Sequence, residues 1–160
     1  MLCPMKSAHD HSHSHATGEA LVAQAQKALV EAGEQWTDMR KDVFVELARH
    51  ERPASAYLIA DNLAQARGKR VAANSVYRIL DLFVATNLAI KIESSNAYLA
   101  NAHPGESHDC IYLVCDECGE AAHVDDKTIS EKLRTLAASN AFQAQRPVLE
   151  IRGLCRQCAA

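Results

Sequence analysis

The chain has 160 residues, a formal charge of −3 and 48% apolar residues, which is the composition of a folded globular protein of one or two domains. It contains no run of about 18 apolar residues, so we expect no membrane span. The N-terminal segment lacks the apolar core of a secretory signal, and we therefore expect a cytoplasmic protein.

Residues 1–17 are polar and rich in histidine and serine, and they show no periodicity, so we expect a flexible tail. Its four imidazoles are His9, His11, His13 and His15. Such a tail is compatible with weak metal binding, with metal delivery, or with a simple spacer.

Four amphipathic helices are predicted from about residue 19 onwards, because apolar residues recur there at helical spacing. Gly33 ends the first helix and Gly68 ends the third. Thr37, Ser55 and Asn74 are the expected N-caps of the second, third and fourth helices, since their side-chain oxygens can accept hydrogen bonds from free N–H groups.

The fourth helix has two distinct faces. Its buried stripe is predicted to consist of Val76, Ile79, Leu80 and Phe83. The opposite face carries Asn74, Tyr77, Arg78 and Asp81. These are hydrogen-bonding and stacking side chains, where a merely solvated helix more often has Glu and Lys, so the outer face is a candidate recognition surface.

After Asn87 the hydrophobic period changes to about two. Residues 89–93 and 97–99 flank Ser94-Ser95-Asn96, which predicts a β-hairpin with a three-residue loop. Four helices followed by a hairpin are the order of a winged helix-turn-helix, with the fourth helix in the recognition position. We therefore expect a DNA-binding domain over residues 18–101.

The remaining residues, 102–160, are predicted to form a second, small α/β domain after a turn-rich linker. Its expected strands are residues 111–114, 121–124 and 148–154. A helix between the second and third strands is expected to start with a capping box, Thr128 and Glu131. About 50 residues bury too little apolar surface to be stable without an additional cross-link.

Two CxxC pairs supply a candidate cross-link, formed by Cys115, Cys118, Cys155 and Cys158. Tetrahedral zinc accepts four thiolates at about 2.3 Å, and each CxxC turn can present two sulfurs to one ion. Two disulfides or a redox switch are the alternatives. The reducing compartment and the absence of a βαβ pattern around either pair favour a closed structural zinc site.

Five segments of the chain resemble motifs of one known family. They are Ser55-Ala56-Tyr57, Ser75-Val76-Tyr77-Arg78-Ile79-Leu80, Lys91-Ile92-Glu93-Ser94-Ser95-Asn96-Ala97-Tyr98, Cys115-Asp116-Glu117-Cys118-Gly119 and Gly153-Leu154-Cys155-Arg156-Gln157-Cys158. The family is that of the ferric-uptake regulator (Fur), and the first and third segments are most similar to its zinc-uptake-regulator (Zur) branch. The resemblance covers about residues 19–158.

The resemblance implies an α+β fold, in which an N-terminal winged-helix DNA-binding domain precedes a small α/β dimerisation domain with structural zinc. It also implies a homodimeric, zinc-responsive repressor of metal-uptake genes. Its partners would be a palindromic operator in double-stranded DNA and a second copy of the chain, with no membrane and no small-molecule substrate.

The expected DNA contacts are Arg40, Tyr57, Asn74, Ser75, Tyr77 and Arg78. Arg78 can donate two hydrogen bonds to guanine or bind a phosphate, and the tyrosines can contact phosphate, sugar or thymine methyl groups. The alternatives are an ion pair between Arg78 and Asp81, and a half-buried packing role for Tyr77. Four cations and no acid lie between residues 66 and 80, namely Arg67, Lys69, Arg70 and Arg78.

A second, regulatory zinc is implied near the hinge, with His103, His108, Cys110 and His123 as the available ligands. A mixed nitrogen and sulfur set suits zinc better than a hard cation. Ile90 and Asn101 stand where the Zur branch has His and Cys, so His103 and Cys110 are expected to replace them. The alternative is that His103 is a solvated loop residue and Cys110 packs on a strand edge.

Three rival functions are an iron- or peroxide-responsive member of the same family, a thiol-based redox sensor, and a zinc enzyme. Arg146-Pro147 stands where iron-sensing relatives have a His, which favours zinc. Neither an HExxH motif nor a deaminase-like HxE…PCxxC pattern is present, so we expect no enzyme.

Overall fold

A computed structural model describes residues 18–106, 109–145 and 147–160 of the chain. The elements are α1 (Gly18–Glu31), α2 (Asp38–Ala48), α3 (Ala56–Arg67), α4 (Ala73–Ala85), β1 (Ala89–Ile92), the 3-10 turn η1 (Glu93–Ser95), β2 (Ala97–Ala100), β3 (Cys110–Cys115), β4 (Ala121–Val124), α5 (Lys127–Ser139) and β5 (Val148–Gly153). The predicted tail, 1–17, with its four histidines, lies outside the described residues. None of the helices in the described part of the chain has the length and apolar character of a membrane span.

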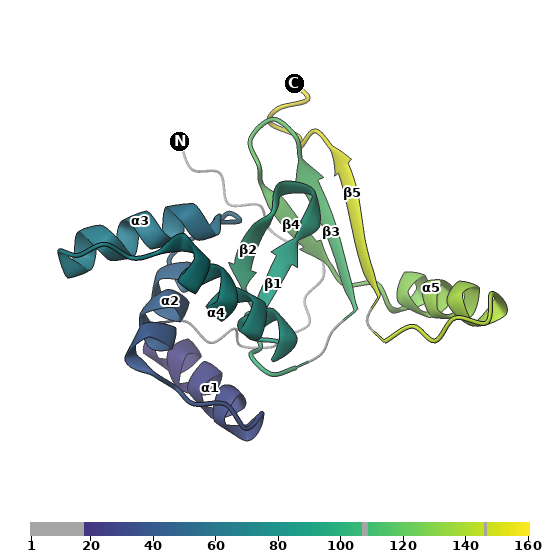
Figure 1. Cartoon of the computed structure of the whole chain (residues 1–160). Helices are drawn as coiled ribbons and strands as arrows, with labels where there is room; N and C mark the ends of the chain where they lie inside the picture. The colour runs from purple at the N-terminus through teal and green to yellow at the C-terminus, as the bar shows by residue number, and fades with distance from the viewer. Residues whose placement is uncertain (1–17, 107–108, 146) are drawn as a thin grey trace.

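Helices α1 to α4 lie together next to the hairpin (Figure 1). Their buried apolar side chains form one core with Ala89 of β1 and Tyr98 of β2. At its centre the rings of Phe44 from α2 and Phe83 from α4 meet edge to face, with centroids 5.8 Å apart. The predicted inner face of α4 is confirmed for Val76, Leu80 and Phe83, which are fully buried, while its fourth member, Ile79, is only partly buried and packs against this core. Burying such side chains contributes about 2 kcal/mol each, so the core fixes which face of α4 points outwards.

The predicted caps are confirmed for α2 and α3 and wrong for α4. The side chains of Thr37 and Ser55 accept hydrogen bonds from the backbone at Arg40 and Leu58. Helix α4 starts two residues earlier than predicted, at Ala73, so that its N-cap is Ala72. Asn74 therefore lies inside the first turn with an exposed side chain.

The cap of α5 also differs from the prediction. Asp126 is the N-cap, and its carboxylate accepts a hydrogen bond from the backbone N–H of Ile129. Thr128 and Glu131 are already helical residues, so they do not form the predicted capping box. Asp126 and Thr128 could each cap this helix, and Asp126 does so.

The hairpin is confirmed, with Ile92 opposite Ala97 and Ala89 opposite Ala100. Its loop comprises residues 93–96 and not only 94–96, because Glu93 belongs to the turn η1. Asn96 closes this turn in the left-handed conformation, with φ of 48°, which Asn adopts more readily than most residues.

The second sheet has the strand order β4-β3-β5, with β3 antiparallel to β4 and parallel to β5. The parallel register places Cys115 beside Gly153, so the second CxxC pair follows directly next to the first. Helix α5 extends away from the end of this sheet (Figure 1).

The hairpin packs on the second sheet through a small apolar cluster. Ile92 of β1 and Tyr112 and Val114 of β3 are its buried members, and Ile90 and Leu99 pack against them. The loop before α3 adds one polar contact, in which Arg52 donates to the carbonyl oxygen of Cys118 over 3.3 Å. The two halves of the chain therefore touch at the wing and at the first CxxC turn.

Candidate metal centre and nucleic-acid interface

The four cysteines of the two CxxC pairs form one cluster. Cys115 ends β3, and the second pair follows β5, where the N–H of Asp116 bonds the carbonyl of Gly153 over 2.8 Å. All four sulfur atoms lie within 4.8 Å of one another. Cys115 is buried and the other three thiols are half-buried, so the cluster is a compact site close to the surface.

The cluster fits a tetrahedral zinc ion. Four sulfurs at about 2.3 Å from a central ion are about 3.8 Å from one another in a regular tetrahedron. The Cys118 and Cys155 sulfurs are 3.8 Å apart. A disulfide needs about 2.05 Å between sulfurs, and the four cysteines are free thiols. The donor set is that of a closed structural site, which leaves no open position for catalysis.

The backbone prepares Cys115 to be a thiolate. Hydrogen bonds from the backbone N–H groups of Cys118 and Cys155 lower the pKa of Cys115 to about 6, and the Cys155 N–H lies 3.3 Å from its sulfur. Hydrogen bonding with Cys155 raises the pKa of Cys158 to about 12. Zinc binds thiolates, so its binding would release the protons that these sulfurs share.

The predicted regulatory ligands are only partly described. His108 and the side chain of Cys110 lie outside the described residues. His103 is half-buried in the segment after β2, and its backbone N–H donates to the side-chain oxygen of Asn101 over 3.0 Å. His123 is exposed on β4, with its ring 5.2 Å from that of Tyr112. Within the described residues, the four cysteines are the only group close enough to share a metal, so the second ligand set stays a prediction.

Ile90 and Asn101 have structural contacts in this fold. Ile90 belongs to the apolar cluster between the hairpin and the second sheet. Asn101 is only 6% exposed, and its amide donates to the carbonyl of Asn87 over 2.7 Å. Asn101 therefore ties the segment after the hairpin back to the end of α4, a function that no motif in the sequence indicated.

The outer face of α4 is open to solvent except at Tyr77, which is half-buried and packs against the core, as in the alternative stated for it. Asn74, Ser75 and Arg78 are exposed on it. Tyr57 of α3 is 63% exposed and lies beside Tyr77 of α4, with ring centroids 5.8 Å apart and planes at 85°. The structure thus brings five of the six predicted DNA contacts onto adjacent parts of α3 and α4.

Arg78 does not form the alternative ion pair. Asp81 accepts a hydrogen bond from the hydroxyl of Tyr98 over 3.3 Å, and Arg78 has no ion pair among the residues that the structure describes. Arg67 differs, because it binds the carboxylate of Asp42. The basic stretch therefore presents Lys69, Arg70 and Arg78 as exposed cations.

The sixth predicted contact, Arg40, is held at the start of α2. Its Nη1 donates to the Glu34 carboxylate over 3.1 Å and to the carbonyl of Gln35 over 2.5 Å. Both bonds are donated by Nη1, and neither Nε nor Nη2 of Arg40 takes part in these two bonds. Arg40 thus fixes the turn between α1 and α2.

Asn96 is a residue of this face that the sequence analysis did not select. Its side-chain amide donates to the hydroxyl of Tyr77 over 3.3 Å. The contact joins the tip of the hairpin to the recognition face of α4. An Asn at the last position of a predicted hairpin loop is the only signal in the sequence, and it indicates a turn and no partner.

The profile of the ferric uptake regulator family matches residues 31–152 of the chain. The zinc uptake regulation protein of Escherichia coli (strain K12) is 29% identical over 143 residues, which cover 89% of this chain and 83% of that protein. The ferric uptake regulation protein of Legionella pneumophila is 30% identical over 92 residues, covering 57% of this chain and 66% of that protein.

Two solved structures resemble the fold over most of its length. The crystal structure of holo XcZur is 34% identical, with a TM-score of 0.74 over 86% of this chain and 96% of that chain. A zinc uptake regulator complexed with zinc and DNA is 29% identical, with a TM-score of 0.77 over 87% of this chain and 93% of that chain. The predicted α+β fold, helices and a hairpin followed by a small mixed sheet with one helix, is confirmed.

Proposed function

The chain belongs to the ferric uptake regulator family, and on this premise we propose that it is a zinc-responsive transcriptional repressor of metal-uptake genes. The relatives named for zinc uptake regulation, which are similar over nearly the whole chain, support zinc as the metal. The protein acts in the cytoplasm as a regulator and not as an enzyme. The Legionella ferric uptake relative matches a shorter part of the chain.

The observation that carries the proposal is the exposed outer face of α4. A helix whose inner face is fixed by the core and whose outer face holds Asn74, Ser75 and Arg78 is suited to the major groove, which admits one α-helix. Arg78 donates to guanine O6 and N7 or to a phosphate. Tyr57 and Tyr77 contact the sugar-phosphate backbone or thymine methyl groups beside it.

Arg40 binds a phosphate at the edge of this interface. Glu34 and Gln35 use only its Nη1, so Nε and Nη2 can donate to a phosphate oxygen without breaking these bonds. The contact lies at the N-terminus of α2, where the helix dipole also favours an anion.

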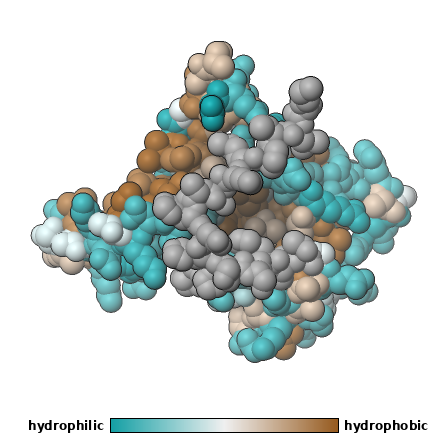
Figure 2. Space-filling view, turned by 180° about the vertical axis from the view of Figure 1, so that it is seen from behind, coloured by the Kyte–Doolittle hydropathy of each residue, from teal (hydrophilic) through white to brown (hydrophobic). Residues whose placement is uncertain are grey.

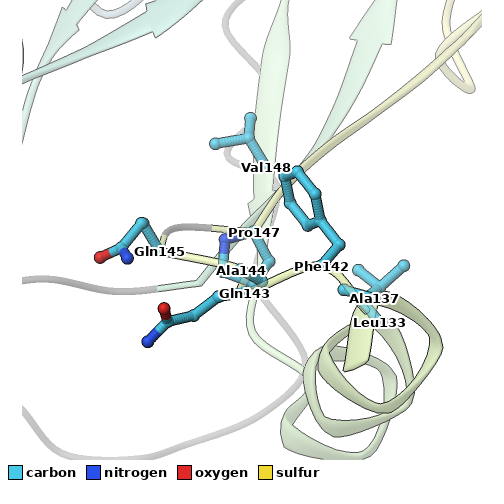
Figure 3. A pocket seen from close by; sticks show the side chains of 8 residues that line it. All are labelled: Leu133, Ala137, Phe142, Gln143, Ala144, Gln145, Pro147 and Val148. Carbon is cyan, nitrogen blue, oxygen red and sulfur yellow. The ribbon is translucent and has the colours of Figure 1, made fainter. Parts of the chain in front are cut away.

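An exposed apolar surface over β3, α5 and β5 supports a homodimer. Leu136 and Phe142 are 61% and 66% exposed, Val148 lines the same hollow as Phe142, and Leu113 and Ile151 are exposed side by side on β3 and β5. Figure 2 shows hydrophobic surface on the side of the sheet from which α5 extends. A hollow of about 420 Å³ lies between α5 and the start of β5, with the ring of Phe142 beside it (Figure 3). A second copy covers this surface, and the two-fold symmetry of the dimer matches a palindromic operator.

Two zinc ions per subunit complete the proposal. The first is held by Cys115, Cys118, Cys155 and Cys158 and cross-links the two ends of the C-terminal half. The second, regulatory ion takes its ligands from His103, His108, Cys110 and His123. In the sequence, His103 and His108 both fall between β2 and β3, where the proposed domains 18–101 and 102–160 are joined.

DNA binding in metal buffers tests the proposal. Operator sites are first selected from random duplex DNA with the zinc-loaded protein, and binding is then measured at fixed free Zn²⁺, Fe²⁺ and Mn²⁺. We expect zinc to switch binding on at the lowest free concentration. Switching by iron or manganese below the zinc threshold would identify an iron-type regulator, and loss of binding by mild peroxide at constant zinc would identify a thiol sensor.

Arg78→Ala tests the interface. We expect it to weaken binding and to relax base preference at one position of each half-site, because a bidentate contact is worth about 1–3 kcal/mol. Lys132→Ala is the matched control, since Lys132 is an exposed cation on α5, in the other half of the chain. Equal effects of the two substitutions would mean that only net charge matters and that α4 does not read the DNA.

A further inference from the structure

We propose that Glu150 is a positioning residue for operator binding, which holds the tip of the wing so that Asn96 can hold Tyr77 on the recognition helix. This inference rests on the proposed function, because it assigns a role in DNA binding to a residue of the other half of the chain. It follows from three consecutive contacts.

The first contact crosses between the two halves of the chain. Glu150 lies in β5, and its carboxylate accepts hydrogen bonds from the backbone N–H groups of Glu93 over 2.6 Å and of Ser94 over 3.1 Å. The partners are 57 and 56 residues apart in the sequence. Bonds from N–H groups to an ionised carboxylate are about twice as strong as neutral ones.

The hydrogen bonds of the Glu150 carboxylate come from the wing, because the charged side chains nearest to it are bonded to other groups. Arg152, the nearest cation along β5, forms an ion pair with Asp116 over 2.7 Å. The Glu93 side chain is turned to Lys91, 3.1 Å away, so only its backbone meets Glu150. Burial acts to raise the pKa of Glu150, but hydrogen bonds from Ser94 and Glu93, together with the positive charge of Arg152, lower it overall, so the carboxylate is ionised at neutral pH.

The second contact is the turn itself. Glu93 to Ser95 form the 3-10 turn η1, and the N–H of Asn96 closes it on the carbonyl of Glu93 over 3.3 Å. Ile92, just before the turn, is fully buried. The turn is short, hydrogen-bonded and anchored at one end, so moving Glu93 and Ser94 also moves Asn96.

The third contact reaches the DNA-facing surface. Asn96 donates to the hydroxyl of Tyr77 over 3.3 Å. The Tyr77 ring lies between Tyr57, at 5.8 Å, and Tyr98, at 6.5 Å, each nearly edge-on. The hydroxyl, the polar end of this ring, is therefore oriented by a residue whose position depends on Glu150. A change in how the two halves pack alters the recognition face by this route.

Glu150→Gln tests the first contact. Glutamine keeps the size of the side chain but places an NH₂ group against one of the two backbone N–H groups. We expect operator binding about tenfold weaker, which corresponds to 1.4 kcal/mol, with unchanged zinc content and dimer mass. The amide proton signals of Glu93 and Ser94 should move upfield in the NMR spectrum. Glu131→Gln, at an exposed glutamate of α5, makes the same charge change and should leave binding unchanged.

Asn96→Gly tests the route from the wing. Glycine adopts the positive φ of this position without strain, so only the amide group is lost. It should weaken binding, and the double variant should bind no more weakly than the weaker single variant, because both act through Tyr77. Additive losses, or normal binding by either single variant, would overturn the inference. A wild-type protein that binds no operator with zinc would instead overturn the proposed function.

Discussion

Replacing Cys158 with serine removes one of four sulfurs from the end of the chain, while Cys115, buried in β3, keeps its place in the sheet. The C-terminal half buries few apolar side chains, chiefly Ile111, Tyr112 and Val114, at about 2 kcal/mol each. Structural zinc contributes about 10–16 kcal/mol through four ligands. Each ligand then contributes about 3 kcal/mol to the free energy of zinc binding, so the zinc affinity of Cys158→Ser should be roughly a hundredfold lower than that of the wild-type protein.

The measurement is competition for zinc with a chromophoric chelator, followed by metal analysis of the protein and thermal unfolding by circular dichroism. We expect Cys158→Ser to lose its zinc first, and to unfold its C-terminal half below the transition of helices α1 to α4. Cys3→Ser is the control, because Cys3 belongs to neither CxxC pair and lies outside the described residues. If Cys158→Ser held as many zinc ions as the wild-type protein, with the same affinities, and melted normally, the cluster would not be a metal site and the reasoning would fail.

Three further substitutions test the packing of residues 18–101. Phe83→Ala should cost about 3–5 kcal/mol of unfolding free energy in urea, since it leaves a cavity beneath α4; a loss under 1 kcal/mol would show that the core can collapse. Asn101→Ala should cost about 2 kcal/mol, because it removes the 2.7 Å bond to Asn87, and hydrogen exchange should show faster opening of the segment after β2; unchanged exchange would contradict this. Glu46→Gln should be less stable than wild type at pH 7. Burial acts to raise the pKa of Glu46, but hydrogen bonds from Asn62 and His50 lower it below 4.5. The stabilisation that the ionised Glu46 provides is therefore present above pH 4.5 and is lost as the pH falls through the folded pKa. The difference between variant and wild type should therefore narrow in acid, and a constant difference would exclude the carboxylate charge as its cause.

Local patterns account for what was predicted well. Thr37 and Ser55 cap their helices, and the stripe of α4 is buried, because a cap or an apolar period needs information only from residues within a few positions. The same local rules failed where two solutions lay close together. Asp126 and Thr128 could each cap α5, and it is the Asp126 carboxylate that accepts the hydrogen bond from the N–H of Ile129.

The helix order, the hairpin, the two CxxC pairs and the polar face of α4 could all be predicted, since each depends on spacing along the chain. Which distant groups meet depends instead on how the elements pack. The parallel register of β3 and β5 brings the cysteine pairs together, and the packing of the hairpin on that sheet places Glu150 against Glu93 and Ser94. Hydrogen bonds of this kind depend on ångström-scale placement of residues more than fifty positions apart, which no periodicity encodes.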